Sequence, residues 1–307
     1  MTKYRSKAEL YKNEIITQYN NGYSTLYLAK KYNTYNTSIK RLLIRNNIYI
    51  RNAHEAANSI KKCPFKDNDE YSDYFLGLLL TDGCITYNKS KTSRYTSLSS
   101  KDKHIIESFR NFVCPKNKVS EYYQKKSHTY IYSTGTRSHL VSDWLESKGN
   151  FVNKSYDCDI YIPLNFNILR GIFDGDGYWH LYRNSLSFGI CSKSFIFINK
   201  IKDFLNTYGI ISYIYIKKKS KNSFLYYLEV HKTIFILKLI YLLYNKATIY
   251  LERKFNIGHS FVETLKNKCV KFKESKDTNP EPNLYRMYTK EGAETIIHYL
   301  NTNFSTW

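Results

Sequence analysis

The sequence predicts an α+β protein in which two pseudo-symmetric repeats, each of the order αββαββα, follow a small all-α domain. Three observations lead to this fold class. Two apolar helical stretches, FLGLLLTDG at 75–83 and LRGIFDGDG at 169–177, end in the same Asp-Gly. Each stretch is followed by two pairs of strand-like runs that helices separate and close. The residues before the first stretch show helical periodicity only.

The N-terminal domain is expected over residues 1–60. Ser24 is a suitable N-cap for a short helix, a polar turn follows at 33–36, and the next helix has one apolar and one basic face. A short helix, a tight turn and a basic helix are typical of a helix-turn-helix, whose last helix enters the major groove of DNA. A plain three-helix bundle with a solvated basic face is the alternative. The side chains expected to face DNA are Thr37, Ser38, Lys40, Arg41 and Arg45.

The rest of the chain is divided by composition and by the repeat. Residues 61–70 are charged, contain a proline and show no periodicity, so they are predicted to be a linker. The first repeat is expected over 71–162 and the second over 163–268. Their strands alternate polar and aromatic residues, which suits sheets with one buried face and one wet face. Residues 269–307 are predicted to form a polar linker and a final amphipathic helix, to which the sequence assigns no role.

The net charge indicates a polyanionic partner. The 307 residues include 47 Lys and Arg against 26 Asp and Glu, a formal charge of +21. A positive field of this kind favours nucleic acid. AT-rich genes also encode much Lys, Asn, Ile and Tyr, so the charge alone leaves a second explanation open.

The cysteines and the hydropathy limit the class of protein further. Six scattered cysteines show neither zinc-site nor disulfide spacing, which indicates reduced thiols. The start lacks an apolar signal core, and no apolar run is long enough to span a bilayer. We therefore expect a soluble intracellular protein, in a bacterial or phage-infected cytoplasm or in an organelle, with no membrane partner.

The two Asp-Gly stretches share a second feature, a glycine five residues before the aspartate. Gly77 precedes Asp82, and Gly171 precedes Asp176. A glycine inside a helix costs about 1 kcal/mol of helix propensity, and a close approach of two helices would compensate for it. If the helices pack side by side in parallel, the two carboxylates meet at the same end. There they repel each other and oppose the helix dipoles.

A divalent cation would relieve this repulsion. With hard oxygen ligands and few carboxylates, Mg²⁺ that keeps waters and binds substrate phosphates is the expected ion. Such a metal, a phosphodiester and water are the components needed to hydrolyse a nucleic-acid backbone. The alternative is a structural Asp-Gly helix end that occurs twice because the halves were duplicated.

The paired stretches resemble the motifs of the LAGLIDADG homing endonucleases, in the single-chain form with two repeats. Asp82 and Asp176 match the catalytic aspartate, and Gly77 and Gly171 match the helix-packing glycine. The resemblance covers about 71–258. It extends to the segments around Lys154, Pro163 and Lys254, and the helix-turn-helix resembles an accessory domain of some members.

One position departs from the motif. Leu80 stands where the motif has its first aspartate, whereas Asp174 stands there in the second copy. This position is usually structural in the family, so the departure leaves the implied activity in place.

The resemblance implies a DNA-binding saddle whose two sheets lie in the major groove, in a protein that acts as a monomer. Two or three divalent ions would be shared between the aspartates and also held by the backbone carbonyls of Thr81 and Gly175. Cleavage would leave a double-strand break with short 3′ overhangs. Lys101 and Lys193 match lysines that assist catalysis in members of the family, although ordinary helix-start lysines are the alternative.

The implied function is a site-specific double-strand DNA endonuclease that hydrolyses phosphodiesters with Mg²⁺ at a long asymmetric target. Two other functions stay open: an RNA maturase that assists intron splicing, with intron RNA as partner, and a non-cleaving DNA-binding regulator. Hairpin side chains are expected to contact DNA, more often at phosphates than at bases. These are Arg94, Tyr95, Lys125, Lys126, Lys217, Lys218, Lys219 and Lys221.

Overall fold

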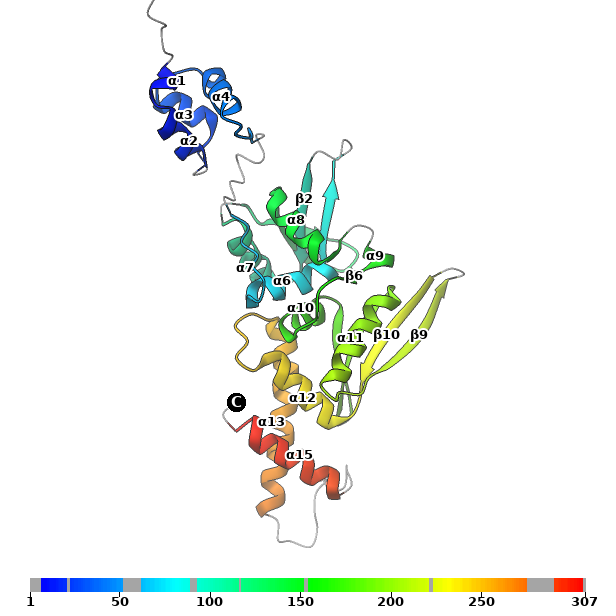
Figure 1. The fold of residues 1–307 in the computed structure, drawn as a ribbon. Coiled ribbons are helices and arrows are strands. Elements are labelled where there is room, and N and C mark those ends of the chain that lie inside the picture. The colour runs from blue at the N-terminus through cyan, green and yellow to red at the C-terminus, as the bar shows by residue number, and fades with distance from the viewer. Residues whose placement is uncertain are drawn as a thin grey trace, which may run out of the picture. The chain divides into compact units, whose positions relative to one another are not determined.

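The computed structural model describes residues 7–20, 23–51, 62–88, 93–115, 117–151, 154–220, 223–274 and 290–305. Figure 1 shows the helices and strands, and the chain divides into two compact units. The first unit comprises Met1–Lys66 and Ile85–Trp144, and the second comprises Asp67–Cys84 and Leu145–Trp307. The division does not follow the repeat boundary expected from the sequence, because the first motif helix belongs to the second unit. The domain boundaries given above therefore stay predictions.

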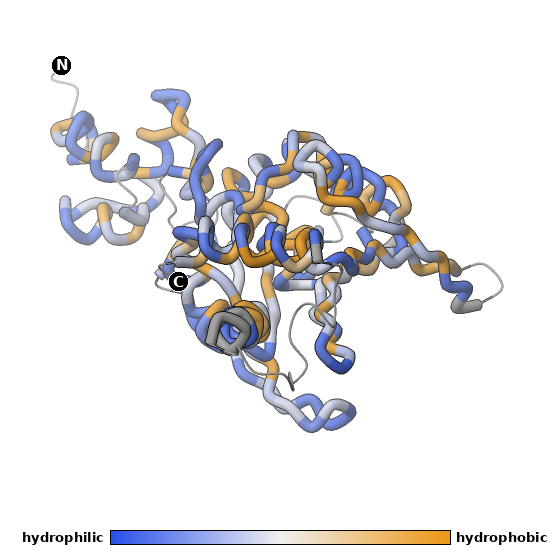
Figure 2. Tube along the Cα trace, turned by 90° about the horizontal axis from the view of Figure 1, so that it is seen from below, coloured by the Kyte–Doolittle hydropathy of each residue, from blue (hydrophilic) through white to orange (hydrophobic). Residues whose placement is uncertain are grey.

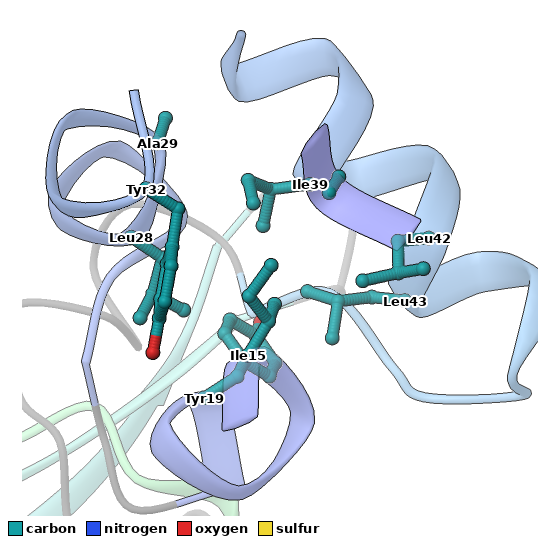
Figure 3. Close-up of a cluster of buried hydrophobic side chains, with 9 residues drawn as sticks. Ile15, Tyr19, Leu28, Ala29, Tyr32, Ile39, Leu42 and Leu43 are labelled. Atoms are coloured by element: carbon teal, nitrogen blue, oxygen red, sulfur yellow. The ribbon is translucent and has the colours of Figure 1, made fainter. Parts of the chain in front are cut away.

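The N-terminal part of the first unit is helical. Ser24 caps the third helix, its Oγ accepting from the backbone N of Tyr27 at 3.1 Å. In the hydropathy colouring of Figure 2, apolar and polar residues alternate along these helices. Their apolar side chains point toward one another in a small core that includes Ile15, Leu28 and Leu42 (Figure 3). The helices are α1 (Lys7–Leu10), α2 (Lys12–Asn20), α3 (Thr25–Lys31) and α4 (Asn36–Arg45).

The turn between α3 and α4 is tight. Asn33 adopts a left-handed backbone with φ of 45°, a conformation that asparagine tolerates better than most residues. The following helix, α4, buries Ile39, Leu42 and Leu43 and exposes its other face. The backbone thus has a short helix, a turn and a second helix, which a plain three-helix bundle would also have. The helix-turn-helix and its role in binding DNA stay predictions.

The first unit also holds a four-stranded sheet of order β1-β2-β4-β3. Strands β2 and β3 both pair antiparallel with β4, and α7 packs against β2 and β4. Its elements are β1 (Gly83–Tyr87), β2 (Arg94–Ser100), α7 (Lys103–Val113), β3 (Ser120–Gln124), β4 (Thr129–Thr136) and the start of α8 (His139–Lys148).

The second unit contains a sheet of the same order, β7-β8-β10-β9, whose strands are antiparallel. Helix α11 packs against β8 and β10 (Figure 1). The predicted α+β class, with the order αββαββα in each repeat, is confirmed. The elements are α10 (Phe166–Asp176), β7 (Gly177–Tyr182), β8 (Ser185–Ser192), α11 (Phe195–Thr207), β9 (Tyr213–Ser220), β10 (Ser223–Val230) and α12 (Thr233–Tyr244).

Several elements of the second unit were not expected from the sequence. A short connector between the repeats contains β5 (Gly149–Asn150), α9 (Lys154–Asp157) and β6 (Asp159–Ile160). A long helix, α13 (Glu252–Glu274), follows α12 and was also not expected. The final helix, α15 (Lys290–Asn303), lies where the sequence predicts one, and it packs on α12 and α13. None of the described helices is both long and apolar enough to cross a membrane.

Candidate active site

Two helices of the second unit carry the motif aspartates, α6 (Glu70–Thr81) and α10. Each begins at a residue that caps it. The Asp69 carboxylate accepts from the N of Ser72 at 3.0 Å, and Asn165 Oδ1 accepts from the N of Ile168 at 2.9 Å. Every residue of α6 from Ser72 to Leu80 is buried, and from Phe75 to Leu80 the helix carries only apolar side chains and Gly77, as expected of a helix surrounded by protein.

Helices α6 and α10 pack against each other backbone to backbone. A Cβ at Gly77 would overlap the carbonyl of Ile168 in α10, so only glycine fits this approach. At the carboxyl ends, a Cβ at Gly175 would overlap the side chain of Thr81. The two helices therefore end side by side. Asp82 follows Thr81, and Asp176 follows Gly175.

Asp82 and Asp176 are both exposed at these joined helix ends. Desolvation by the surrounding protein, and then the negative charge of Asp176, raise the pKa of Asp82 to about 6. Desolvation also raises the pKa of Asp176, against the opposing charges of Lys154 and Lys254. Within the described part of the chain, neither carboxylate has a hydrogen-bond or ion-pair partner. Both remain available to a ligand from solvent.

Lysines from later in the chain cap the two helix ends. Lys154 Nζ donates to the carbonyl of Leu79 at 3.0 Å and to that of Thr81. Lys254 Nζ donates to the carbonyls of Asp174 at 2.9 Å and Gly177 at 2.6 Å, and also to that of Phe173. The last carbonyls of a helix lack helical partners and carry its negative dipole end, so a cation is favourable there.

Burial lowers the pKa of both lysines. Desolvation lowers the pKa of Lys254 to about 8, although Asp174 and the two motif aspartates oppose the shift. Desolvation lowers the pKa of Lys154 as well. Each motif aspartate therefore lies beside an ammonium group that the protein holds in a fixed place.

Neither capping lysine was assigned to the site from the sequence. Lysine is usually exposed, so nothing in the local sequence shows that these two side chains reach back to the helix ends. The signal lies in the repeat: Lys154 and Lys254 occupy similar places downstream of Asp82 and Asp176, in segments noted above only for their family resemblance.

The lysines predicted to assist catalysis follow the second strand of each sheet. Lys101 follows β2 and is exposed in the first unit, whereas Asp82 belongs to the second. Lys193 is partly buried between β8 and α11. Their catalytic roles stay predictions. The carbonyl of Thr81, expected to face a metal, accepts a hydrogen bond from Lys154 and keeps one lone pair for another partner.

The predicted DNA contacts in the sheets differ in accessibility. Arg94 forms an ion pair with Asp143 and is largely buried, and the half-buried ring of Tyr95 lies under the guanidinium of Arg137, at 5.2 Å. Lys125 and Lys126 are exposed in the β3–β4 turn, and Lys217 and Lys218 are exposed on β9. Lys219 lies near the end of β9, and Lys221 lies outside the described residues.

The predicted DNA contacts on α4 share one face. Thr37, Lys40 and Arg41 are exposed and Ser38 is half-buried. Arg45 differs, since its guanidinium pairs with Glu9 of α1 at 3.1 Å. For these residues too, contact with DNA stays a prediction.

The residues at the helix ends fit a divalent cation. Across the described residues, no three His, Cys, Asp or Glu side chains come together as a metal cluster. A cation would therefore be held by Asp82, Asp176, backbone oxygens and water. Two carboxylates with several waters suit Mg²⁺. The cation would also neutralise the repulsion from Asp176, which adds to desolvation in raising the pKa of Asp82.

The family resemblance is confirmed by a sequence-family model. Residues 163–243, which extend from just before α10 to the end of α12, match the model of a LAGLIDADG-like domain. No curated protein sequence matches the chain.

Solved structures with a similar fold include two homing endonucleases. The homing endonuclease I-WcaI bound to its DNA recognition sequence is 16% identical, covers 61% of this chain and 85% of its own, and gives a TM-score of 0.46. I-LtrWI, a LAGLIDADG homing endonuclease bound to target DNA, is 15% identical over 76% of this chain and 97% of its own, with a TM-score of 0.43. Full-length DUF199/WhiA from Thermatoga maritima is 16% identical over 69% and 68%, with a TM-score of 0.43. At these values the likeness carries no argument about function.

Proposed function

We propose that the chain is a site-specific, Mg²⁺-dependent DNA endonuclease that acts as a monomer on a long asymmetric target. The observation that carries this proposal is the pair of exposed carboxylates, Asp82 and Asp176, held together at the ends of two packed helices. A purely structural helix end would not need two charges that repel each other. The net charge of +21 supplies the attraction to DNA.

The residues of the site have separate roles in this proposal. Asp82 and Asp176 bind the cations, with backbone oxygens of Thr81 and Gly175 as further ligands. A bound divalent cation supplies charge neutralisation at the phosphate and a more acidic attacking water. Lys154 and Lys254 hold the two helix ends in register through their carbonyl contacts and add positive charge beside the carboxylates.

The rest of the chain binds the duplex. The exposed lysines of β9 and of the β3–β4 turn contact phosphates along the sheets. The exposed face of α4, with Thr37, Lys40 and Arg41, extends the footprint into a neighbouring major groove. Because the two repeats have different strand residues, the preferred target is asymmetric.

Cleavage of a plasmid library that carries genomic inserts tests the proposal. Wild-type protein with Mg²⁺ is expected to cut at one site, and EDTA is expected to stop cutting. Asp82→Asn and Asp176→Asn are expected to abolish cleavage and leave duplex binding largely intact. Asp203→Asn is the matched control, because Asp203 is an exposed carboxylate on α11 that is hydrogen-bonded to Asn199 at 3.0 Å.

Other results would select the other functions. Undiminished cutting by either motif variant would reject the metal-site assignment. Tight duplex binding by the wild type with no cutting in Mg²⁺ would identify a non-cleaving DNA-binding protein. Preference for a structured intron RNA over duplex DNA would favour a maturase.

A further inference from the structure

The two motif helices differ two residues before each aspartate. Leu80 stands there in α6 and Asp174 stands there in α10, and both side chains are almost completely buried, with exposures of 2% and 1%. A buried carboxylate is costly unless hydrogen bonds compensate for it. The hydrogen-bond partners of the Asp174 carboxylate therefore indicate its role.

Asp174 holds the start of α13. Its Oδ2 accepts from the backbone N of Leu251 at 2.8 Å and from the hydroxyl of Tyr74 at 2.8 Å. Leu251 is the residue from which α13 begins, because its carbonyl accepts from the N of Lys254 and of Phe255 at 3.0 Å. The side chain of Asp174 thus fixes the first turn of α13 against the end of α10.

Lys254 lies in that first turn. Its Nζ reaches back to the end of α10, where it donates to the carbonyls of Asp174 and Gly177 on either side of Asp176. Two contacts therefore connect α10 to α13. The carboxylate of Asp174 in α10 accepts from the start of α13, and the ammonium of Lys254 in α13 donates to the end of α10. Neither contact alone would fix both the helix start and the amine.

The first repeat lacks this second connection. Leu80 has no side-chain acceptor, and its carbonyl accepts a weak hydrogen bond from Cys158 Sγ at 3.6 Å. Lys154 lies in α9, a helix of four residues, and is half-buried, whereas Lys254 is 4% exposed. Within the described residues, the lysine of the second repeat is held more firmly than that of the first.

We infer that Asp174 is a positioning residue that holds Lys254 beside Asp176, and that the two halves of the site are unequal because Leu80 cannot do the same for Lys154. This inference rests on the proposed function for its consequence in catalysis. Its structural part, that Asp174 holds Lys254 in place, is independent of that function and can be tested even if the protein does not cleave DNA.

Chemical acetylation of lysines, read by mass spectrometry, tests the structural part. Asp174→Leu copies the first repeat and removes the acceptor of Leu251. The acetylation rate of Lys254 is expected to rise by about tenfold through local opening, while that of Lys154 stays within about twofold. Equal increases at both lysines would indicate general destabilisation and overturn the inference, as would an unchanged rate at Lys254.

Two further variants separate positioning from damage to the core. Tyr74→Phe removes the other donor to the same oxygen and leaves the Leu251 contact, so Lys254 is expected to react as in the wild type. Asp174→Asn keeps an acceptor for Leu251 and is expected to restore most of the protection. Should Asp174→Leu not fold, Asp174→Ser is measured instead, because its shorter side chain cannot span both contacts.

Strand-specific nicking tests the consequence for catalysis. A duplex target labelled differently on each strand gives the two nicking rates separately. Asp174→Leu is expected to slow one strand about tenfold more than the other, a difference of about 1.4 kcal/mol in activation free energy. If the nicking rates of both strands fell equally, the inference that the two halves of the site are unequal would be rejected. If the wild type nicks neither strand, the proposed function fails while the acetylation result stands.

Discussion

Gly77 and Gly171 occupy equivalent positions where α6 crosses α10. A Cβ on Gly77 would overlap the carbonyl oxygen of Ile168, and a Cβ on Gly171 would overlap that of Tyr74. Ile168 and Tyr74 each lie eight residues before the motif aspartate of their own helix. The contact is therefore reciprocal, and it explains why both helices carry a glycine that costs about 1 kcal/mol of helix propensity.

Alanine at either glycine should separate the two helices. Gly77→Ala and Gly171→Ala are each expected to lower the free energy of unfolding by about 1–3 kcal/mol, because the added methyl meets backbone atoms that cannot move aside. Denaturant unfolding measures the change. Gly258→Ala in α13 is the control: its Cβ would meet only the side chain of Ile240, at 3.4 Å. That variant should be neutral or stabilising by up to about 1 kcal/mol, and an equal loss in all three would contradict the explanation.

The shifted carboxyl of Asp82 makes stability depend on pH. Its pKa is about 6 in the folded protein and about 3.9 in an unfolded chain. The folded state binds this proton more tightly, so stability falls as pH rises from about 4 through about 6. In metal-free buffer, Asp82→Asn should melt at a higher temperature than the wild type at pH 7.5 and at the same temperature below pH 4.

Addition of Mg²⁺ should reverse that order, because the cation stabilises the wild type and finds one ligand fewer in the variant. Asp203→Asn should show neither effect. A wild type whose melting temperature is insensitive to both pH and Mg²⁺ would contradict the assignment of a repelling carboxylate pair.

The capping lysines should matter more for cleavage than the lysines expected from the family resemblance. Lys154→Met and Lys254→Met are each expected to lower the cleavage rate by roughly 100-fold, the low end of the effect of removing one preorganised donor from an active site. Lys101→Met and Lys193→Met should have smaller effects. Rates are compared at saturating DNA and below the melting transition of each variant. The reverse order of effects would return the catalytic role to Lys101 and Lys193.

Much of the fold could be predicted because it depends on local sequence patterns. The helix-two-strand-helix order follows from periodicity and from turn residues, and Ser24 was predicted to cap α3 as it does. Helix α13 was missed because its sequence, ERKFNIGHSFVETLKNKCVKFKE, is polar and contains Gly258. The short strands β5 and β6 carry no periodic signal at all, since each has two residues.

The candidate site could be predicted only in part. Asp82 and Asp176 were found because they close a pattern that occurs twice. The lysines that cap the two helix ends come from the segments at 154 and 254, which only the folded chain brings there. The hydrogen bond from the amide of Leu251 to the carboxylate of Asp174, 77 residues away, cannot be predicted from the local sequence of either residue. Long-range polar contacts of this kind require the structure.

The basic face of α4 should appear in the salt dependence of DNA binding. Lys40→Ala and Arg41→Ala are each expected to reduce the slope of log Kd against log salt concentration by about 0.9, the value for one lost phosphate contact. Arg45→Ala should change the slope less, because Arg45 is paired with Glu9. Equal changes for all three would show that the ion pair opens on binding. No change for Lys40 and Arg41 would remove α4 from the interface.

The C-terminal helix should stabilise the second unit and take no part in the chemistry. Phe304, just after α15, is completely buried and packs edge-on against Tyr241 of α12, with ring centroids 5.7 Å apart. Phe304→Ala should cost about 3–5 kcal/mol of unfolding free energy through the cavity that it leaves. Phe195→Ala, at a ring that is 49% exposed, should cost less than about 1 kcal/mol. Below its melting transition, the Phe304 variant should cleave DNA at the wild-type rate, and a loss of cleavage with unchanged stability would instead give this helix a direct role in the reaction.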